Sequence, residues 1–341
     1  MRKTMNSYER TVNFIKGETV DHPPFHPIIM RWAAKYADVK FRDFCCDYKS
    51  KAYAYIKCAE DFNIDWVTVM SDAYVEAVGY GLQVEFPEDD LPLETGGHLV
   101  DLDAVSNLSR YNIYDNPRIV NTIKTIEEFK KQVGGEKFIL GWVEGSIAEY
   151  GDIRGLSMCS MDFFDDENAV HHALDVITEV AIDMITAQIE AGADCIGIGD
   201  AFCSQIGPDL YNRFAFEREK RLVDHIHSLG AFAKLHICGD TTAILPQMIA
   251  TGADIVDVDF LVDSMKPFAH LLSDTQVFSG KSDPVEIIQN STPELINESI
   301  KSCFEQTGGR CITSAGCEIT PGTSLENFTA YSKSAETLNN E

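Results

Sequence analysis

Short apolar runs alternate with longer amphipathic segments along the second half of the chain. Each run is too short for a typical helix and is bounded by Gly, Pro or charged residues, which predicts a buried strand. The predicted strands cover residues 195–200, 232–239, 255–260, 277–283 and 311–318. The segments between them have helical spacing, including one near residues 263–272. Such alternation predicts parallel strands joined by helical crossovers.

The first half of the chain repeats this pattern less regularly. Residues 23–29, 66–72 and 137–145 predict three more strands, and residues 41–62 and 167–192 predict two of the helices between them. Eight strand–helix units in a chain of 341 residues fit an α/β protein of the (β/α)8 TIM-barrel class.

The chain shows no internal linker and no low-complexity segment, so residues 1–341 predict a single barrel domain. The main insertion follows the second strand, around residues 73–125. It is rich in Pro, Gly and acidic residues, which predict loops and short strands at a rim. The alternative fold is an open doubly wound sheet, which often carries a Gly-rich phosphate-binding loop. The sequence contains no such loop.

Composition limits the classes of partner. A hydrophobic fraction of 45% allows a large core and argues against disorder. The formal net charge is −26 and no Lys/Arg-rich run occurs, which argues against a nucleic-acid partner because phosphate binding needs a positive surface. A polyanionic substrate would need a strongly positive local pocket to overcome this field.

The cysteine content is informative about the compartment. The chain starts without an apolar signal segment and has no stretch long enough to span a membrane, which predicts a cytoplasmic protein. In a reducing compartment the ten cysteines are expected to be thiols or metal ligands rather than disulfides. Cys58, Cys195 and Cys303 lie among apolar neighbours and are interpreted as ordinary packed residues.

Side chains that bind metals or move protons collect at the predicted strand ends. In a (β/α)8 barrel the catalytic residues lie at the carboxyl ends of the strands. The candidates are Asp72, Glu144, Asp200, His236, Cys238, Asp257, Asp259, Lys281, Asp283, Cys317 and Glu318. A purely structural barrel has no need of such a set.

His236 and Cys238 form the sharpest motif. Residues i and i+2 of a strand point the same way, so the imidazole and the thiol face a common point. Cys317 ends the eighth strand and can reach the same barrel mouth. Mixed nitrogen and sulfur ligands favour zinc, and three protein ligands leave one position for substrate. The H-x-C motif alone is also compatible with a hydrogen-bonded core His and a buried Cys.

The sequence does not decide which residue is the fourth ligand of such a zinc site. Asp257 and Asp259 lie on one face of the sixth strand. Either carboxylate can complete the site when substrate is absent, and Asp259 is our candidate. The other interpretation is a carboxylate that hydrogen-bonds behind the ligands. His225 and His227 do not share a face of their predicted helix, so they are not expected to be ligands.

Four other strand-end residues are candidates for substrate contact or proton transfer. Asp72 can orient substrate or cap the turn after the second strand. Glu144 can act as a general acid or contact substrate, or can form a structural salt bridge. Asp200 is a further candidate for substrate binding. Lys281 can bind an anionic group or pair with Asp283.

At these residues the sequence resembles the uroporphyrinogen decarboxylase superfamily, and more closely its branch of zinc-dependent methylcobamide:thiol methyltransferases of the coenzyme M type. The resemblance covers nearly the whole chain and is carried by residues 28–49, 235–260, 278–284 and 314–328. In the methyltransferases an H-x-C motif and a distant Cys bind zinc. The resemblance therefore implies that His236, Cys238 and Cys317 are the zinc ligands.

The decarboxylases of the superfamily are the alternative. Their first segment has two arginines for substrate carboxylates; here Arg31 matches and is a candidate for substrate binding, whereas Lys35 replaces the second arginine. Their last strand ends in His where this chain has Cys317. Asp72 matches in both branches. A net charge of −26 also fits poorly with a substrate that bears eight carboxylates.

The resemblance implies methyl transfer between a methylcorrinoid and a thiol, or the reverse from an oxygen- or nitrogen-linked methyl donor. Corrinoid proteins bind cobalt through D-x-H-x-x-G, and the nearest string here, residues 225–230, has His in place of Asp. The corrinoid is therefore expected on a separate partner protein. A non-catalytic barrel that captures a thiol or a tetrapyrrole is the remaining hypothesis.

Overall fold

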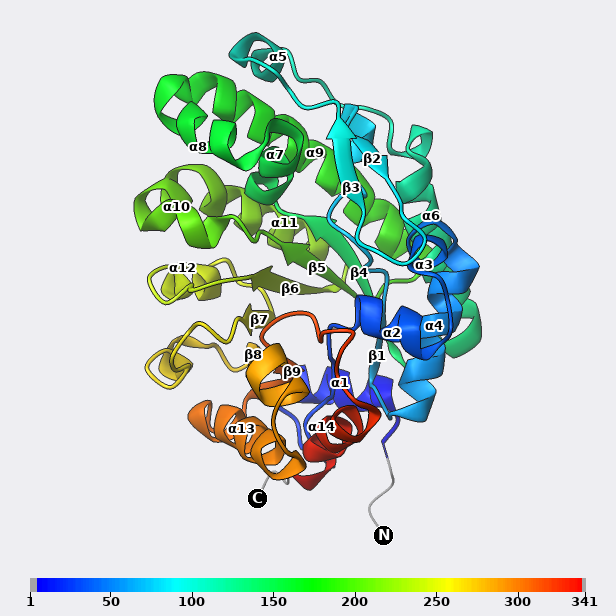
Figure 1. Ribbon diagram of the computed structural model, residues 1–341. Helices are drawn as coiled ribbons and strands as arrows, with labels where there is room; N and C mark the ends of the chain where they lie inside the picture. The colour runs from blue at the N-terminus through cyan, green and yellow to red at the C-terminus, as the bar shows by residue number, and fades with distance from the viewer. Residues whose placement is uncertain (1–4, 339–341) are drawn as a thin grey trace.

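A computed structural model describes residues 5–338 of the chain. Seven parallel strands form one curled sheet in the order β1-β4-β5-β6-β7-β8-β9. The helices lie around the outside of these strands (Figure 1). The strands are β1 (Trp66–Thr68), β4 (Phe138–Glu144), β5 (Cys195–Gly199), β6 (Phe232–Ile237), β7 (Ile255–Val258), β8 (Val277–Ser282) and β9 (Cys311–Ala315).

All seven strands coincide with strands predicted from the hydrophobic pattern. β5 and β7 are buried along their whole length because helices cover one face of the sheet and the other face encloses a side-chain core. Burial on both faces explains why these strands appear in the sequence as continuous apolar runs rather than as alternating patterns.

The predicted strand over residues 23–29 is reduced to a single bridge. The backbone N–H of His26 donates to the carbonyl oxygen of Thr313 in β9, and the N–H of Thr313 donates to the carbonyl oxygen of Pro24. Each donor–acceptor distance is 2.9 Å. On the other side Phe25 accepts from Asp65, just before β1, at 3.0 Å. The segment therefore hydrogen-bonds beside both edge strands. It cannot form a longer ladder because it includes three prolines, at positions 23, 24 and 27, which lack the N–H donor.

The helices follow the strands in the expected alternation, and several more precede them. The α-helices are α1 (Ser7–Ile15), α2 (Met30–Tyr36), α3 (Phe41–Cys46), α4 (Tyr48–Asp61), α5 (Leu102–Ser106), α6 (Pro117–Val133), α7 (Ser146–Arg154), α8 (Leu156–Asp165), α9 (Glu167–Ala191), α10 (Cys203–Leu210), α11 (Phe216–Ser228), α12 (Leu245–Ala250), α13 (Pro293–Gln306) and α14 (Leu325–Thr337). In the described part of the chain none of them has the length and apolar character that a membrane crossing requires.

The helix predicted near residues 263–272 is wrong. Only a short 3-10 turn, η4 (Ala269–Leu271), forms there. Pro267 interrupts the helical pattern because its ring removes one backbone donor and clashes with the preceding turn. The side chain of Gln306 instead holds the segment by accepting from Ser264 and from the backbone of Met265, each at 3.1 Å.

Between β1 and α6 the chain makes a small separate hairpin. β2 (Gln83–Glu85) pairs antiparallel with β3 (Leu93–Gly96), and the 3-10 turn η1 (Ala77–Tyr80) precedes it. Figure 1 shows this hairpin in cyan, separate from the main sheet. Loops and short strands are what the Pro-, Gly- and acid-rich composition of residues 73–125 predicts.

Two glycines of β5 leave room for an aromatic side chain next to His236, which is a predicted metal ligand. A Cβ atom at Gly197 would approach the indole ring of Trp142 to 2.3 Å, and one at Gly199 would approach it to 2.5 Å. The indole of Trp142, from β4, therefore lies against the bare backbone of β5. Its ring centroid is 6.2 Å from that of His236, which pairs with Gly199 in register. Larger residues at either position would push Trp142 away from His236.

Candidate metal centre

Two strands bring three potential ligands together. His236 lies in β6, Cys238 follows directly after that strand, and Cys317 lies two residues beyond the end of β9. The Nε2 atom of His236 is 3.0 Å from Sγ of Cys238, which is 3.4 Å from Sγ of Cys317. All three ligand atoms lie within 4.8 Å of one another. The structure thus groups the residues that the sequence predicts as zinc ligands.

The spacing of these atoms fits a metal ion better than a disulfide. A disulfide would join the sulfurs at about 2.05 Å, whereas Cys238 and Cys317 are free thiols 3.4 Å apart. Tetrahedral zinc, with bonds of about 2.0–2.3 Å, holds its ligand atoms less than about 4 Å from one another. One nitrogen and two sulfurs at these separations suit zinc in both geometry and softness.

A buried carboxylate orients the imidazole. Oδ2 of Asp257 lies 2.9 Å from Nδ1 of His236 and 2.9 Å from Nζ of Lys234. Because Nδ1 faces Asp257, Nε2 is turned toward the two cysteines, an arrangement common behind metal-ligating histidines. Burial alone would raise the pKa of Asp257, but Lys234 and His236 hold it below its usual range.

Hydrogen bonds among the three predicted ligands shift their pKa values. The hydrogen bond from Cys238 lowers the pKa of Cys317 to about 4 despite burial, and His236 adds to this effect. The same contact raises the pKa of Cys238. Burial lowers the pKa of His236, but Asp257 and Cys317 outweigh it and raise the pKa to about 9. The centre is therefore prepared to carry at least one thiolate, which is the metal-binding form of cysteine.

We expect the substitution Asp257→Asn to lower zinc affinity by about 10- to 100-fold, the usual effect of removing a carboxylate behind a ligating histidine. It also leaves the Lys234 ammonium buried without its partner, which costs about 3–5 kcal/mol of stability. The double variant Asp257→Asn/Lys234→Met should recover the stability but not the affinity. Zinc competition titrations and thermal unfolding measure the two effects separately. Wild-type zinc affinity in the single variant would contradict the orienting role.

Asp72 is not free at the barrel mouth. Its Oδ2 lies 2.5 Å from a terminal nitrogen of Arg118 and accepts from Ser71 at 2.8 Å. Its Oδ1 accepts from the backbone of Tyr74 at 3.2 Å, a turn-capping contact. Burial raises the pKa of Asp72, but Arg118 outweighs it and lowers that pKa. The substrate-orienting role of Asp72 remains a prediction, whereas the turn-capping contact is present.

Glu144 ends β4 beside the metal centre. Nε1 of Trp142 donates to its Oε1 at 3.0 Å, and its backbone N–H donates to Oε1 of Glu76 at 3.0 Å. Burial raises the pKa of Glu144 well above its usual range, and the carboxyls of Glu76 and Asp152 raise it further. A protonated carboxyl at this position is chemically suited to a general acid, and that role of Glu144 stays a prediction. No cation pairs with Glu144 in the described part of the chain.

Asp200 and Lys281 have partners within the protein. Asp200 is fully buried, and its Oδ1 accepts from the backbone of Ala148 at 2.7 Å, which caps the start of α7. The Nζ atom of Lys281 donates to the carbonyl oxygen of Val262. The roles of both side chains in substrate binding stay predictions.

Arg31 and Asp259 also have partners within the protein. Arg31 contacts the carboxylate of Glu318, next to Cys317, at 3.5 Å. Asp259 is buried, and its Oδ1 accepts from the backbone of Leu261 at 3.0 Å. Burial raises the pKa of Asp259. Asp259 does not belong to the group of three atoms within 4.8 Å, so its part as a fourth ligand is still a prediction.

Several buried polar residues escaped the sequence analysis. Lys234 lies two residues before His236 in the same strand, so strand periodicity could have indicated that both face inward. Cys203 and Glu219 group with Asp200 within 4.8 Å, all three fully buried. They lie on helices whose contacts no local pattern specifies. The carboxyls of Glu76, Glu149 and Asp152 were missed for the same reason.

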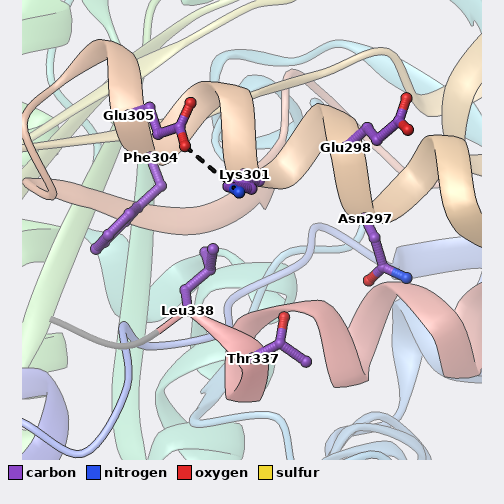
Figure 2. A pocket seen from close by; sticks show the side chains of 7 residues that line it. All are labelled: Asn297, Glu298, Lys301, Phe304, Glu305, Thr337 and Leu338. Carbon is purple, nitrogen blue, oxygen red and sulfur yellow. Dashed lines mark ion pairs between the residues drawn. The ribbon is translucent and has the colours of Figure 1, made fainter. Parts of the chain in front are cut away.

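A surface cavity lies away from the candidate metal centre. One cavity of about 630 Å³ lies between α13 and α14, and Figure 2 shows the side chains that line it. It contains the exposed ion pair of Lys301 and Glu305, 3.7 Å apart. In a βα unit the carboxyl end of the helix lies at the opposite end from the carboxyl end of the strand. This cavity is therefore remote from the metal centre.

Comparisons with known proteins show the family to which the chain belongs. The family described as uroporphyrinogen decarboxylase (URO-D) matches residues 6–338. Methylcobamide:CoM methyltransferase MtbA of Methanosarcina mazei is 30% identical over 241 residues, covering 69% of this chain and 68% of that protein. Uroporphyrinogen decarboxylase of Parasynechococcus marenigrum is 26% identical over 343 residues, covering 95% and 94%.

The solved structure of a methyltransferase from Methanosarcina mazei has the same fold. It superposes with a TM-score of 0.86 at 22% identity, covering 97% of this chain and 98% of that one. A B12-independent methionine synthase from Shewanella superposes less closely, with a TM-score of 0.56 at 12% identity. The family match spans nearly every described residue, and the curled parallel sheet is that of a related solved structure. The chain therefore belongs to the uroporphyrinogen decarboxylase family, and its relatives include corrinoid methyltransferases.

Proposed function

We propose that this protein is a zinc-dependent methyltransferase that moves a methyl group between a methylcorrinoid on a separate corrinoid protein and a small-molecule thiol. It would do so as a single (β/α)8 barrel domain with an insertion around residues 73–125. The observation that carries the proposal is the group of His236, Cys238 and Cys317. The similarity to a methylcobamide:CoM methyltransferase supports the same reaction class.

The reaction needs a thiolate, and a free thiol is mostly protonated at neutral pH. When bound, zinc supplies a Lewis acid that lowers the pKa of a coordinated thiol. His236, Cys238 and Cys317 would hold the ion, and Asp257 fixes the orientation of His236. Trp142 forms a wall beside His236 and limits the directions from which a substrate can approach.

The remaining side chains complete the proposal. Glu144 would hold or move a proton at its carboxyl group, and Asp72 would shape the pocket through its contact with Arg118. Arg31, Asp200 and Lys281 are proposed to contact or position the substrate. Asp259 would occupy the fourth ligand position while substrate is absent. A reducing cytoplasm is proposed as the compartment, where cysteines persist as thiols or metal ligands.

A direct assay tests the reaction class. Zinc-loaded protein incubated with methylcobalamin and a small thiol should demethylate the corrinoid and form the methyl thioether. The rate is expected to be low without the natural corrinoid protein, but to depend on both protein and thiol. The same preparation should not decarboxylate uroporphyrinogen. Decarboxylation without zinc would place the protein with its decarboxylase relatives instead, and zinc content with no transfer in either direction would indicate a binder.

A further inference from the structure

Four carboxyl groups lie close enough together to raise one another's pKa, and we call them the carboxyl cluster: Glu76, Glu144, Glu149 and Asp152. Three separate segments supply them. Glu144 ends β4, Glu76 precedes η1, and Glu149 and Asp152 lie on α7. The last two are three residues apart and so share one face of that helix.

Trp142 connects the carboxyl cluster to the metal centre. Its indole N–H donates to Glu144 at 3.0 Å, and the same ring lies 6.2 Å from the imidazole of His236. Glu144 and His236 both pair with Gly199 of β5 in register, one from each side. The cluster and the predicted ligands therefore flank one strand at the same end of the sheet.

The carboxyl cluster forms no ion pair with a cationic side chain among the described residues; Arg118 only lowers the pKa of Glu76, against the stronger effect of burial. The nearby Arg118 is paired with Asp72 and Arg154 with Asp162, at 2.5 and 2.7 Å. Glu149 is only 1% exposed, and neither of its carboxyl oxygens has a hydrogen-bond partner. Leaving a buried carboxyl unpaired is costly, so the fold maintains an acidic site that no ion pair in the described chain neutralises.

The carboxyls respond to this crowding by holding protons. Burial raises the pKa of Glu76 to about 7 and that of Asp152 to about 8, and neighbouring carboxyls add to both shifts. Burial raises the pKa of Glu149 well above its usual range, and the neighbouring carboxyl of Glu76 raises it further. A cation placed among these groups would favour their ionised forms and displace protons.

We infer that the non-reacting end of the small-molecule substrate is an ammonium group, which binds the carboxyl cluster while the other end of the substrate reaches His236, Cys238 and Cys317. The inference deepens the proposed function and rests on it for the identity of the reacting end. Trp142 is half-buried and offers an aromatic face next to Glu144, a favourable neighbour for a cation.

An anionic end group of the substrate would find few cationic partners at this end of the barrel. Arg31, on the side of Cys317, is already in contact with Glu318. The ammonium of Lys281 is turned to the carbonyl oxygen of Val262. A sulfonate or carboxylate on the substrate would compete with the oxygen atoms already at these two cations and would face the carboxyl cluster across the site.

Three thiols of matched size test the inference. 2-Aminoethanethiol is cationic, 2-mercaptoethanol is neutral, and 2-mercaptoethanesulfonate is anionic. Calorimetry on the zinc-loaded protein at about 0.15 M salt, where distant surface charges are screened, should rank them in that order. We expect the aminothiol to bind at least about tenfold more tightly than the sulfonate, since opposite charges attract strongly in a partly buried site. Equal affinities, or a preference for the sulfonate, would overturn the inference.

Two variants separate the cluster from the overall negative charge. Asp152→Asn, which removes a half-buried cluster carboxylate, should reduce the preference for the aminothiol to less than about threefold. Asp209→Asn removes one exposed carboxylate of α10 and should leave the preference unchanged. An unchanged preference in Asp152→Asn would mean that the ranking comes from the global field, and the inference would fail.

A metal-free measurement makes the test independent of the methyltransferase proposal. Ethylammonium should bind the zinc-depleted protein and release protons, which calorimetry in two buffers of different ionisation enthalpy can count. Ethanesulfonate of the same size should not bind. Absence of ethylammonium binding would overturn the inference. Ethylammonium binding together with a protein that holds no zinc and transfers no methyl group would retain the cation site and refute the proposed reaction.

Discussion

Replacing Cys238 by Ala is expected to remove most of the zinc from the purified protein, from about one ion per chain to a small fraction of that. Cys238 is the central member of the ligand group, with neighbours at 3.0 and 3.4 Å. Losing this sulfur leaves two protein ligands, too few for a stable site. The loss of affinity should exceed the roughly 10- to 100-fold effect of removing an outer carboxylate. Metal analysis after dialysis measures the content.

The chain offers a matched control for this substitution. Cys46 lies on α3, is exposed and is not part of the ligand group, so Cys46→Ala should keep the full zinc content. Circular dichroism and thermal unfolding of both variants establish that the barrel is intact. Full zinc retention in a folded Cys238→Ala variant would refute the ligand assignment, and zinc loss in Cys46→Ala would point to a different site.

Removing the metal is expected to slow methyl transfer to a thiol by at least about 100-fold. Only a few per cent of a typical thiol is ionised at neutral pH, so loss of ionisation alone accounts for roughly a 30-fold decrease. Loss of the ordered position of the thiol beside the methyl donor accounts for the rest. The assay follows methylcobalamin consumption after chelation and dialysis.

Restoring activity with different metals provides the control. Zinc added back should recover the rate, whereas magnesium should not, because the sulfur-rich ligand set of His236, Cys238 and Cys317 is too soft for a hard cation. Variants at Cys317 should show the same low rate and no recovery. Full activity in metal-depleted protein would exclude a metal-dependent transfer and refute the zinc-dependent mechanism.

The sequence predicted the alternation of strands and helices and the two halves of the candidate metal centre. Seven strands appeared where apolar runs predicted them. The pairing of His236 with Cys238 follows from the two-residue repeat of a strand, which is a property of the backbone. Cys317 joins them because parallel strands of one sheet present their carboxyl ends at one edge. Periodicity and strand direction are local or follow from topology, so a single sequence can reveal them.

Charge partners and close packing were fixed by the tertiary structure alone. Asp72 meets Arg118 across 46 positions of sequence, and Lys234 approaches His26 across 208. The space for Trp142 depends on glycines of the neighbouring strand, and the carboxyl cluster depends on where η1 and α7 return to the sheet. Coulombic and hydrogen-bond energies fall with distance in space, regardless of separation along the chain. Register and the paths of the connections therefore decide which groups pair, and they left the carboxyl cluster without an ion pair in the described part of the chain.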